Sequence, residues 1–287
     1  MEVSDFISGT ELMKLCDLCV FESTQNMNWF KSCKYIYNID KQPTEEDIKI
    51  IKNAKKIFIK RLHNGSDFVI IFLNKFYNIL LNDIIIITHC SDYGVYEKNI
   101  QILTLPKIKK WYGMNCYIRH PKLIPVPIGM TTYDKKHGNM KLLEKVINRT
   151  TSKTNLLYVN CDVRSNRNKR VPLMELMRRK GYKVIVGEKS LDQEVYWTEL
   201  AQSKFIISPP GNGVDCHRIW ESIYLGTIPI VERNIVLEPF THLPILFIDD
   251  WNVINNEFLE RKWEEFSQKT FDTRMCYMKY WAENIKG

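Results

Sequence analysis

The segment at 203–231 constrains the fold more than any other part of the chain. It reads SKFIISPPGNGVDCHRIWESIYLGTIPIV. An apolar run is followed by a break rich in Pro and Gly, then by apolar residues at three- and four-residue spacing, and then by a second apolar run. This order predicts a strand, a turn, a helix and another strand, which is the repeating unit of a parallel α/β sheet.

The turn and the start of the predicted helix form a candidate anion site. We expect the helix to begin near Asp215, directly after the glycine turn at 211–213. The first turn of such a helix has unpaired backbone N–H groups and a partial positive charge, which favour a phosphate. Arg218 can donate to a diphosphate, and Glu221 can accept from ribose hydroxyls. The alternative is an ordinary βαβ unit with an exposed Arg–Glu pair, in which Asp215 caps the helix and repels phosphate.

This segment resembles the signature of exostosin-like glycosyltransferases, which consists of a Ser-Pro-x-Gly turn, an Arg-x-x-Glu helix and a Gly-x-Ile-Pro-Ile strand. Three other segments resemble that family in the same order, namely ITHCSDYG at 87–94, HPKLIPVPIGM at 120–130 and YVNCDVRSNRNKR at 158–170. The resemblance implies a GT-B fold, in which two Rossmann-like domains face an interdomain cleft. It also implies that the C-terminal domain binds most of a nucleotide-sugar donor.

A cluster of cations extends the predicted donor site. The strand expected near residue 156 is followed by Arg164, Arg167, Lys169 and Arg170, and we expect the next helix to open at Pro172. We assign the first two arginines to the donor phosphates, with an ordinary surface role as the alternative, and we expect the last two cations to face solvent. The other predicted donor-binding residues are Ser208, Pro210, Gly211, Asn212, Gly213, Arg218 and Glu221.

The candidate catalytic residues follow a different strand. The β-branched run at 83–88, DIIIIT, predicts a strand buried on both faces of a parallel sheet, and His89 and Asp92 lie in its exit loop. Open α/β sheets bind ligands beyond the carboxyl ends of their strands. Either side chain could therefore be the general base that deprotonates an acceptor hydroxyl. The structural alternatives are that Asp92 caps a turn and that His89 bonds buried backbone.

The net charge and the sequence motifs indicate which classes of binding partner to expect. The formal charge of +8 suits anionic ligands such as nucleotide diphosphates, and it also suits nucleic acid or an anionic membrane surface. The sequence has no recognised nucleic-acid motif, so we do not expect a nucleic-acid partner. It has no leader pattern and no apolar segment long enough to span a bilayer. We therefore expect a cytoplasmic protein without a membrane span.

Neither a metal nor a cofactor is expected. Asp249 and Asp250 are adjacent and do not form a D-x-D motif, and no such motif occurs elsewhere. Cys16 and Cys19 form a C-x-x-C pair without a second pair, which favours reduced core thiols over a zinc site. We expect positive side chains and a helix terminus to stabilise the leaving diphosphate.

The predicted organisation is an N-terminal Rossmann-like acceptor domain at 1–150 and a C-terminal Rossmann-like donor domain at 151–287. Helices are expected at 11–21 and 68–81. By the resemblance, the helix expected at 275–285 crosses back to the first domain and packs there through Tyr277, Tyr280 and Trp281.

The predicted function is transfer of a sugar from a nucleotide diphosphate-sugar to a hydroxyl of a glycan, protein or small-molecule acceptor. The resemblance implies UDP as the nucleotide, inversion at the anomeric carbon and no metal requirement. The alternative is a non-catalytic nucleotide-binding or nucleic-acid-binding protein of the same doubly wound α/β architecture.

Overall fold

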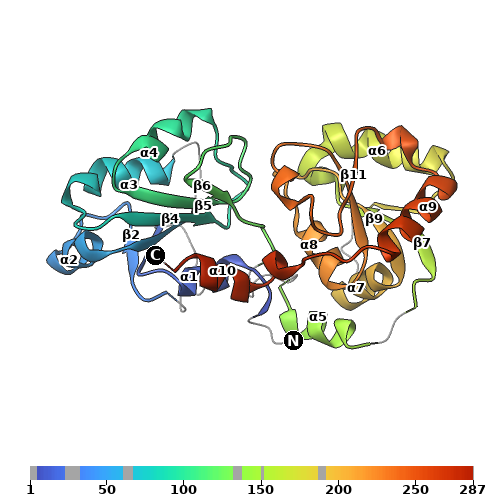
Figure 1. Cartoon of the computed structure of the whole chain (residues 1–287), viewed down its shortest axis with the longest axis horizontal. Coiled ribbons are helices and arrows are strands. Elements are labelled where there is room, and N and C mark those ends of the chain that lie inside the picture. The colour runs from blue at the N-terminus through green and yellow to red at the C-terminus, as the bar shows by residue number, and fades with distance from the viewer. Residues whose placement is uncertain are drawn as a thin grey trace. The chain divides into compact units, whose positions relative to one another are not determined.

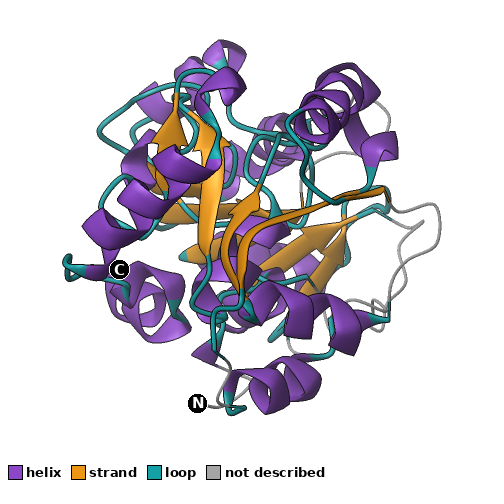
Figure 2. Cartoon of the chain, turned by 90° about the vertical axis from the view of Figure 1, so that its right-hand side faces the viewer, coloured by secondary structure: helices purple, strands orange, loops and turns teal. Residues whose placement is uncertain are grey.

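The computed structural model describes residues 5–22, 33–60, 67–131, 138–149, 152–186 and 192–286. The chain forms two compact units (Figure 1). The N-terminal unit consists of Ser4–Gly138 with Met275–Gly287, and the C-terminal unit is built from Asn139–Arg274. Each unit has one parallel sheet with helices against it, so the α/β class and the two Rossmann-like sheets are as predicted (Figure 2). The boundary predicted at residue 150 lies beyond the point of division, on the far side of α5 (Met140–Ile147).

The sheet of the N-terminal unit has the strand order β2-β1-β3-β4-β5-β6, and all its pairings are parallel. This is the doubly wound order, in which the chain reverses direction across the sheet after β2. The strands are β1 (Leu18–Phe21), β2 (Ile36–Asn38), β3 (Lys56–Lys60), β4 (Ile84–His89), β5 (Ile108–Gly113) and β6 (Leu123–Pro125). The helices are α1 (Gly9–Lys14), α2 (Glu45–Asn53), α3 (Phe68–Phe76), α4 (Ile100–Thr104) and α10 (Met278–Asn284).

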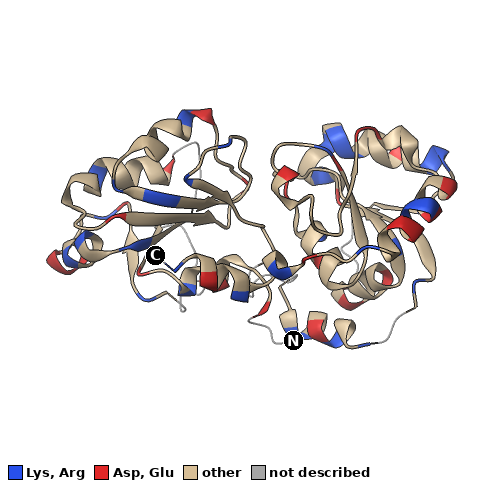
Figure 3. Ribbon diagram, viewed as in Figure 1, with Lys and Arg blue, Asp and Glu red and all other residues tan. Residues whose placement is uncertain are grey.

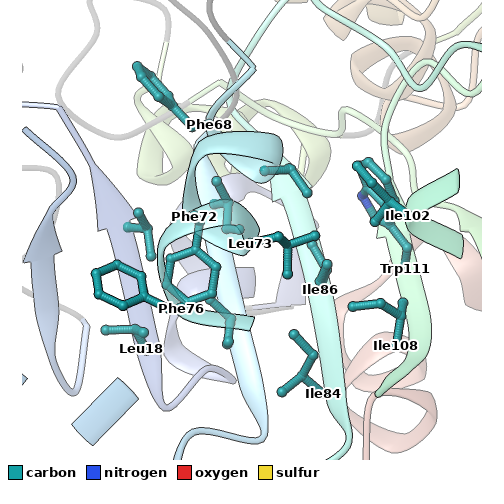
Figure 4. Packing of buried hydrophobic residues seen from close by; sticks show 14 of the residues in the cluster. Leu18, Phe68, Phe72, Leu73, Phe76, Ile84, Ile86, Ile102, Ile108 and Trp111 are labelled. Carbon is teal, nitrogen blue, oxygen red and sulfur yellow. The ribbon is translucent and has the colours of Figure 1, made fainter. Parts of the chain in front are cut away.

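Helix α3 covers one face of this sheet and confirms the helix predicted at 68–81. The carboxylate of Asp67 caps its N-terminus by accepting from the backbone N–H of Val69 at 3.1 Å. Phe72 and Phe76 of α3 belong to the same buried cluster as Ile86 of β4 (Figure 4). Because β4 is buried along its whole length, its continuous β-branched run has apolar partners on both faces.

Helix α10 completes the N-terminal unit, as predicted for the terminal helix. The hydroxyl of Tyr112 on β5 donates to the carbonyl oxygen of Asn284 at 2.8 Å. The ring of Tyr112 also meets that of Trp281 edge-on, with a centroid separation of 6.3 Å. Trp281 is 1% exposed and donates its indole N–H to the carbonyl oxygen of Met275. Helix α10 is thus part of the core of the N-terminal unit, although its sequence follows that of the C-terminal unit.

The helix predicted at 11–21 is wrong in its second half. The structure has α1 at Gly9–Lys14 and then β1 at Leu18–Phe21, a fully buried strand between β2 and β3. A short apolar run has the same periodicity in a buried strand and a buried helix, so its neighbours in the sheet decide its conformation.

The C-terminal unit repeats the doubly wound topology with the strand order β11-β10-β9-β7-β8. The strands are β7 (Asn155–Cys161), β8 (Val184–Val186), β9 (Ser203–Ile207), β10 (Ile228–Glu232) and β11 (Leu246–Ile248). The helices besides α5 are α6 (Arg167–Arg179), α7 (Gln193–Ala201), α8 (His217–Tyr224) and α9 (Asn256–Ser267). Because β7 and β9 are neighbours but β8 lies outside β7, the strand order reverses between β7 and β9. This reversal is the topological switch point of the sheet.

Helix α6 begins earlier than predicted. Pro172 lies inside the helix, which starts at Arg167. The side chain of Asn166 provides the N-cap, accepting from the backbone N–H of Lys169 at 3.4 Å. The asparagine cap therefore marks the start of α6, and Pro172 is its sixth residue.

Candidate functional site

The predicted donor-binding residues lie on two loops at the switch point of the C-terminal unit and on the helices that follow these loops. One loop follows β7 and leads into α6, and the other follows β9 and leads into α8. Since β7 and β9 are adjacent parallel strands, both loops lie at the same edge of the sheet. In doubly wound sheets, this edge at the switch point is where ligands bind.

Arg170 joins the two loops. Its guanidinium donates from Nη1 to the carbonyl oxygen of Asp162 at 2.5 Å and from Nε to that of Pro210 at 2.9 Å. Nη2 donates to the carbonyl oxygen of Pro209 at 3.3 Å. Arg170 is only 4% exposed, so the prediction that it faces solvent is wrong. The turn leaves its carbonyl groups without strand partners, and a buried arginine satisfies them.

The glycine turn is tightly fitted against this arginine. A Cβ atom on Gly211 would lie 2.8 Å from Nη2 of Arg170, so a larger residue would displace the guanidinium. The backbone N–H of Gly211 donates to the carbonyl oxygen of Gly213 at 2.9 Å, and the side chain of Asn166 donates to the carbonyl oxygen of Gly211 at 3.0 Å. Asn212 is exposed at the tip of the turn. The turn is therefore held in shape by the protein itself.

Helix α8 begins at His217, two residues later than predicted. Asp215 is buried, and its carboxylate accepts from the indole N–H of Trp220 at 2.7 Å. The N-cap is Cys216, whose side chain makes no capping hydrogen bond. The N-cap side chains of α5, α6, α7 and α9 all accept from their helices. Among these helices of the C-terminal unit, α8 is thus the one whose N-cap side chain makes no capping hydrogen bond.

Arg218, in the first turn of α8, is partly buried and unpaired. Its Nε atom is buried without a hydrogen-bond partner, and the described parts of the chain form no ion pair with its guanidinium. Burial opposes its charged form while neighbouring ionisable groups, Glu221 among them, favour it, so the pKa of Arg218 lies above its usual value. The hydroxyl of Ser208, which follows β9, is also buried without a partner. Buried donors without acceptors are costly in a folded protein, so these two groups are candidate donors to a ligand.

Glu221 lies one turn after Arg218 on α8. It is buried, so the alternative of an exposed Arg–Glu pair does not hold. It is 6% exposed and accepts from the hydroxyl of Tyr196 on α7 at 3.1 Å. Burial, followed by the negative charge of Glu221, raises the pKa of Tyr196 well above its usual value. The tyrosine therefore stays protonated and orients the carboxylate.

The two arginines assigned to the donor phosphates lie on the surface. Arg164 donates from Nε and Nη2 to the carboxylate of Asp162 at 3.0 Å and 2.7 Å, and this pair lowers the pKa of Asp162. Arg167 is exposed at the first position of α6. Sequence reasoning chose these residues over Arg170, because spacing alone does not show which cation of a cluster is buried.

The predicted catalytic residues belong to the N-terminal unit. His89 ends β4, is 2% exposed and shares a hydrogen bond of 3.0 Å between its Nε2 atom and the carbonyl oxygen of Pro127. Asp92 is exposed in the loop that follows. Between them Cys90 has a φ of 59°, a conformation that non-glycine residues adopt at strained positions. Asp92 is thus accessible to an acceptor, while His89 bonds buried backbone.

Within the described segments, no group of three or more His, Cys, Asp or Glu side chains is arranged to hold a metal ion. No helix in those segments is long and apolar enough to cross a bilayer.

The part of the chain that contains this site matches a known protein family. Residues 147–287 match the family model described as the RXYLT1 C-terminal domain. The match supports the assignment of this region to a glycosyltransferase family. It spans just under half of the chain and covers β7 to β11, including the glycine turn, Arg170, Arg218 and Glu221. No curated protein matches the chain.

Proposed function

We propose that this protein transfers a sugar from a nucleotide diphosphate-sugar to a hydroxyl group of an acceptor. The observation that carries the proposal is Arg218, whose buried Nε lacks a hydrogen-bond partner at the switch point of the sheet. A diphosphate would give this guanidinium the acceptor that the described protein does not provide. The family match over residues 147–287 supports transfer chemistry at this site.

The surrounding residues support particular roles in that reaction. The acceptor oxygen forms a bond to the anomeric carbon while the bond from that carbon to the diphosphate breaks. Arg218 and the partial positive charge at the N-terminus of α8 would stabilise the negative charge on the leaving diphosphate. Glu221, oriented by Tyr196, would accept from the ribose hydroxyls. The acceptor proton would pass to a general base, for which Asp92 is the accessible candidate.

We infer a GT-B enzyme that uses UDP, inverts the anomeric centre, needs no metal and acts in the cytoplasm. Two doubly wound units and a terminal helix shared with the first unit support the GT-B assignment. The distribution of charge supports a small anionic ligand over nucleic acid, since Lys and Arg are interspersed with Asp and Glu on both units (Figure 3).

A thermal unfolding experiment tests the donor site. The native protein is heated with UDP, GDP, CMP or their common sugar conjugates, in EDTA and in its absence. A nucleotide at 100 times its dissociation constant should add about 2.7 kcal/mol of stability, which corresponds to a shift of several degrees. Arg218→Ala should abolish this shift. Arg178→Ala, which removes an exposed arginine of α6, should retain it.

Turnover then separates an enzyme from a binding protein. Release of nucleoside diphosphate that depends on an acceptor would support transfer. Stabilisation by a nucleotide without release would favour the non-catalytic alternative. If no nucleotide shifts the unfolding temperature of the native protein, the proposed donor site is wrong.

A further inference from the structure

A pocket in the N-terminal unit is lined by tyrosines and two charged residues. Its volume is about 620 Å³, and its lining residues are Tyr93, Tyr96, Glu97, Lys98 and Tyr117. We call it the tyrosine pocket. It is formed by the loops that follow β4 and β5, adjacent strands near the middle of the sheet. The volume lies within the range of roughly 300–1,000 Å³ that is usual for small-molecule sites.

The two loops are joined by backbone hydrogen bonds. Val95 donates to the carbonyl oxygen of Asn115 at 3.0 Å, and Tyr117 donates to that of Val95 at 2.8 Å. A Cβ atom on Gly94 would lie 1.8 Å from the carbonyl oxygen of Asn115. Only glycine permits this approach, so the shape of the pocket depends on a specific residue type.

A buried polar network fixes Tyr96. Its backbone N–H donates to Oδ1 of Asn99 at 3.0 Å, and Nδ2 of Asn99 donates to Oδ2 of Asp67 at 2.9 Å. Asn99 is fully buried and Asp67 is 7% exposed. Since Asp67 also caps α3, the wall of the pocket is connected to the core of the unit.

Backbone strain is concentrated in the same loops. In the described segments, the non-glycine residues with positive φ are Cys90 at 59° and Asn115 at 48°. Cys90 lies in the loop after β4, and Asn115 lies in the loop after β5. Such conformations are unfavourable and tend to occur at functional sites.

The chemistry of the lining suits a sugar ring. Tyr96 and Tyr117 are stacked with their ring centroids 4.8 Å apart and their planes inclined by 9°, and Tyr93 is 45% exposed. Flat aromatic faces provide apolar surface at low entropic cost, and phenol hydroxyls add polar edges. Glu97 and Lys98 are exposed, and neither forms an ion pair within the segments that the structure describes. A pyranose has the matching features, an apolar face of C–H groups and a rim of hydroxyls.

We infer that the tyrosine pocket binds a carbohydrate and that this carbohydrate is the acceptor. The acceptor role rests on the proposed glycosyltransferase function, whereas carbohydrate binding rests on the pocket itself. Asp92, the candidate general base, immediately precedes Tyr93 of the pocket. The inference narrows the acceptor from any hydroxyl compound to one that presents a sugar ring.

Saturation-transfer NMR with methyl glycosides of glucose, galactose, mannose and N-acetylglucosamine tests this inference. At least one glycoside should receive saturation from the native protein, mainly on the protons of one ring face. Tyr93→Ala should weaken binding about five-fold, as expected for loss of one aromatic contact. The matched control Tyr182→Ala, in the C-terminal unit, should not change it. The inference is overturned if no glycoside binds, or if Tyr93→Ala and Tyr96→Ala both bind as the native protein does.

Nucleotide-induced stabilisation, measured on the same samples, separates the two proposals. Loss of glycoside binding in Tyr93→Ala with unchanged nucleotide stabilisation supports the acceptor assignment. If nucleotides stabilise the protein but no glycoside binds, the tyrosine pocket is not a carbohydrate site, and the proposed donor site is unaffected. Glycoside binding that is sensitive to Tyr93→Ala in a protein that binds no nucleotide overturns the acceptor role, and with it the proposed function.

Discussion

Arg170 and Pro210 are joined by a hydrogen bond of 2.9 Å between the guanidinium Nε and the carbonyl oxygen, across the two loops of the switch point. This bond shapes the glycine turn before any ligand arrives. The charge of Arg170 is directed to backbone carbonyl groups, whereas Arg218 has no such partners in the described chain. One arginine thus builds the site, and the other remains available to a ligand.

Removing the buried arginine should destabilise the protein. Arg170→Met would leave three backbone carbonyl groups without this donor, and we expect a loss of about 2–4 kcal/mol in the free energy of unfolding. Urea unfolding followed by tryptophan fluorescence measures it. The control is Lys169→Met, at an exposed neighbouring position, which should change stability by less than about 0.5 kcal/mol. Equal stability of the two variants would contradict the structural role of Arg170.

The buried hydrogen bond to Glu221 should contribute to stability and to nucleotide affinity. Tyr196→Phe removes a donor to a buried carboxylate, which should cost about 1–3 kcal/mol. Because the carboxylate is then less well oriented, nucleotide affinity should also fall. Tyr182→Phe is the control, since the hydroxyl of Tyr182 donates to the exposed residue Asn256. A donor affinity unchanged in Tyr196→Phe would argue against a ribose contact by Glu221.

Lys153 should make stability depend on pH. Its ammonium donates to the carbonyl oxygens of Ala201 and Leu225 and to the hydroxyl of Thr227, and burial lowers its pKa from 10.5 to about 8. Between these two values the unfolded chain binds more protons than the folded chain at this residue. The contribution of Lys153 to the free energy of unfolding should therefore rise from about pH 8 to about pH 10.5.

The comparison of native protein with Lys153→Met isolates this contribution. Unfolding free energies of both proteins are measured across that pH range, so that tyrosines and other groups titrating in both proteins cancel. The difference, native minus variant, should increase with pH. A flat or falling difference would show that the ammonium is not desolvated in the folded state.

Asp92 and His89 should respond differently to substitution. Asp92→Asn, at an exposed position, should lower the transfer rate by about 10²–10⁴-fold if Asp92 is the general base. His89→Phe removes the partner of a buried carbonyl group and should lower stability by about 1–3 kcal/mol. Asp249→Asn is the exposed control for the rate. A transfer rate within two-fold of the native rate in Asp92→Asn would exclude Asp92 as the base.

The elements that follow from local sequence were predictable. The β-branched run at 83–88 became β4, and the stretch at 68–81 became α3 followed by a short 3-10 turn. The turn and helix after β9 appeared in their predicted order, with the helix start displaced by two residues. These features depend on periodicity and on residues with strong backbone preferences, which act over a few positions.

The features that depend on distant partners were not predictable. Burial of Arg170 is set by carbonyl groups about 40 residues later in the chain, and the strand character of β1 is set by its pairing with β3. The unpaired state of Arg218 and the tyrosine pocket likewise arise only when loops from neighbouring strands meet. Sequence spacing therefore identified the segments of the site but not the role of each side chain.

The return of α10 to the N-terminal unit affects the order of folding on the ribosome. The C-terminal unit is synthesised in full before the residues that complete the earlier unit have emerged. Until then, the ring of Tyr112 lacks its contact with Trp281, and its hydroxyl lacks the carbonyl oxygen of Asn284. The half of the protein that is made first is therefore the half that matures last, and a nascent chain exposes apolar surface to chaperones throughout that interval.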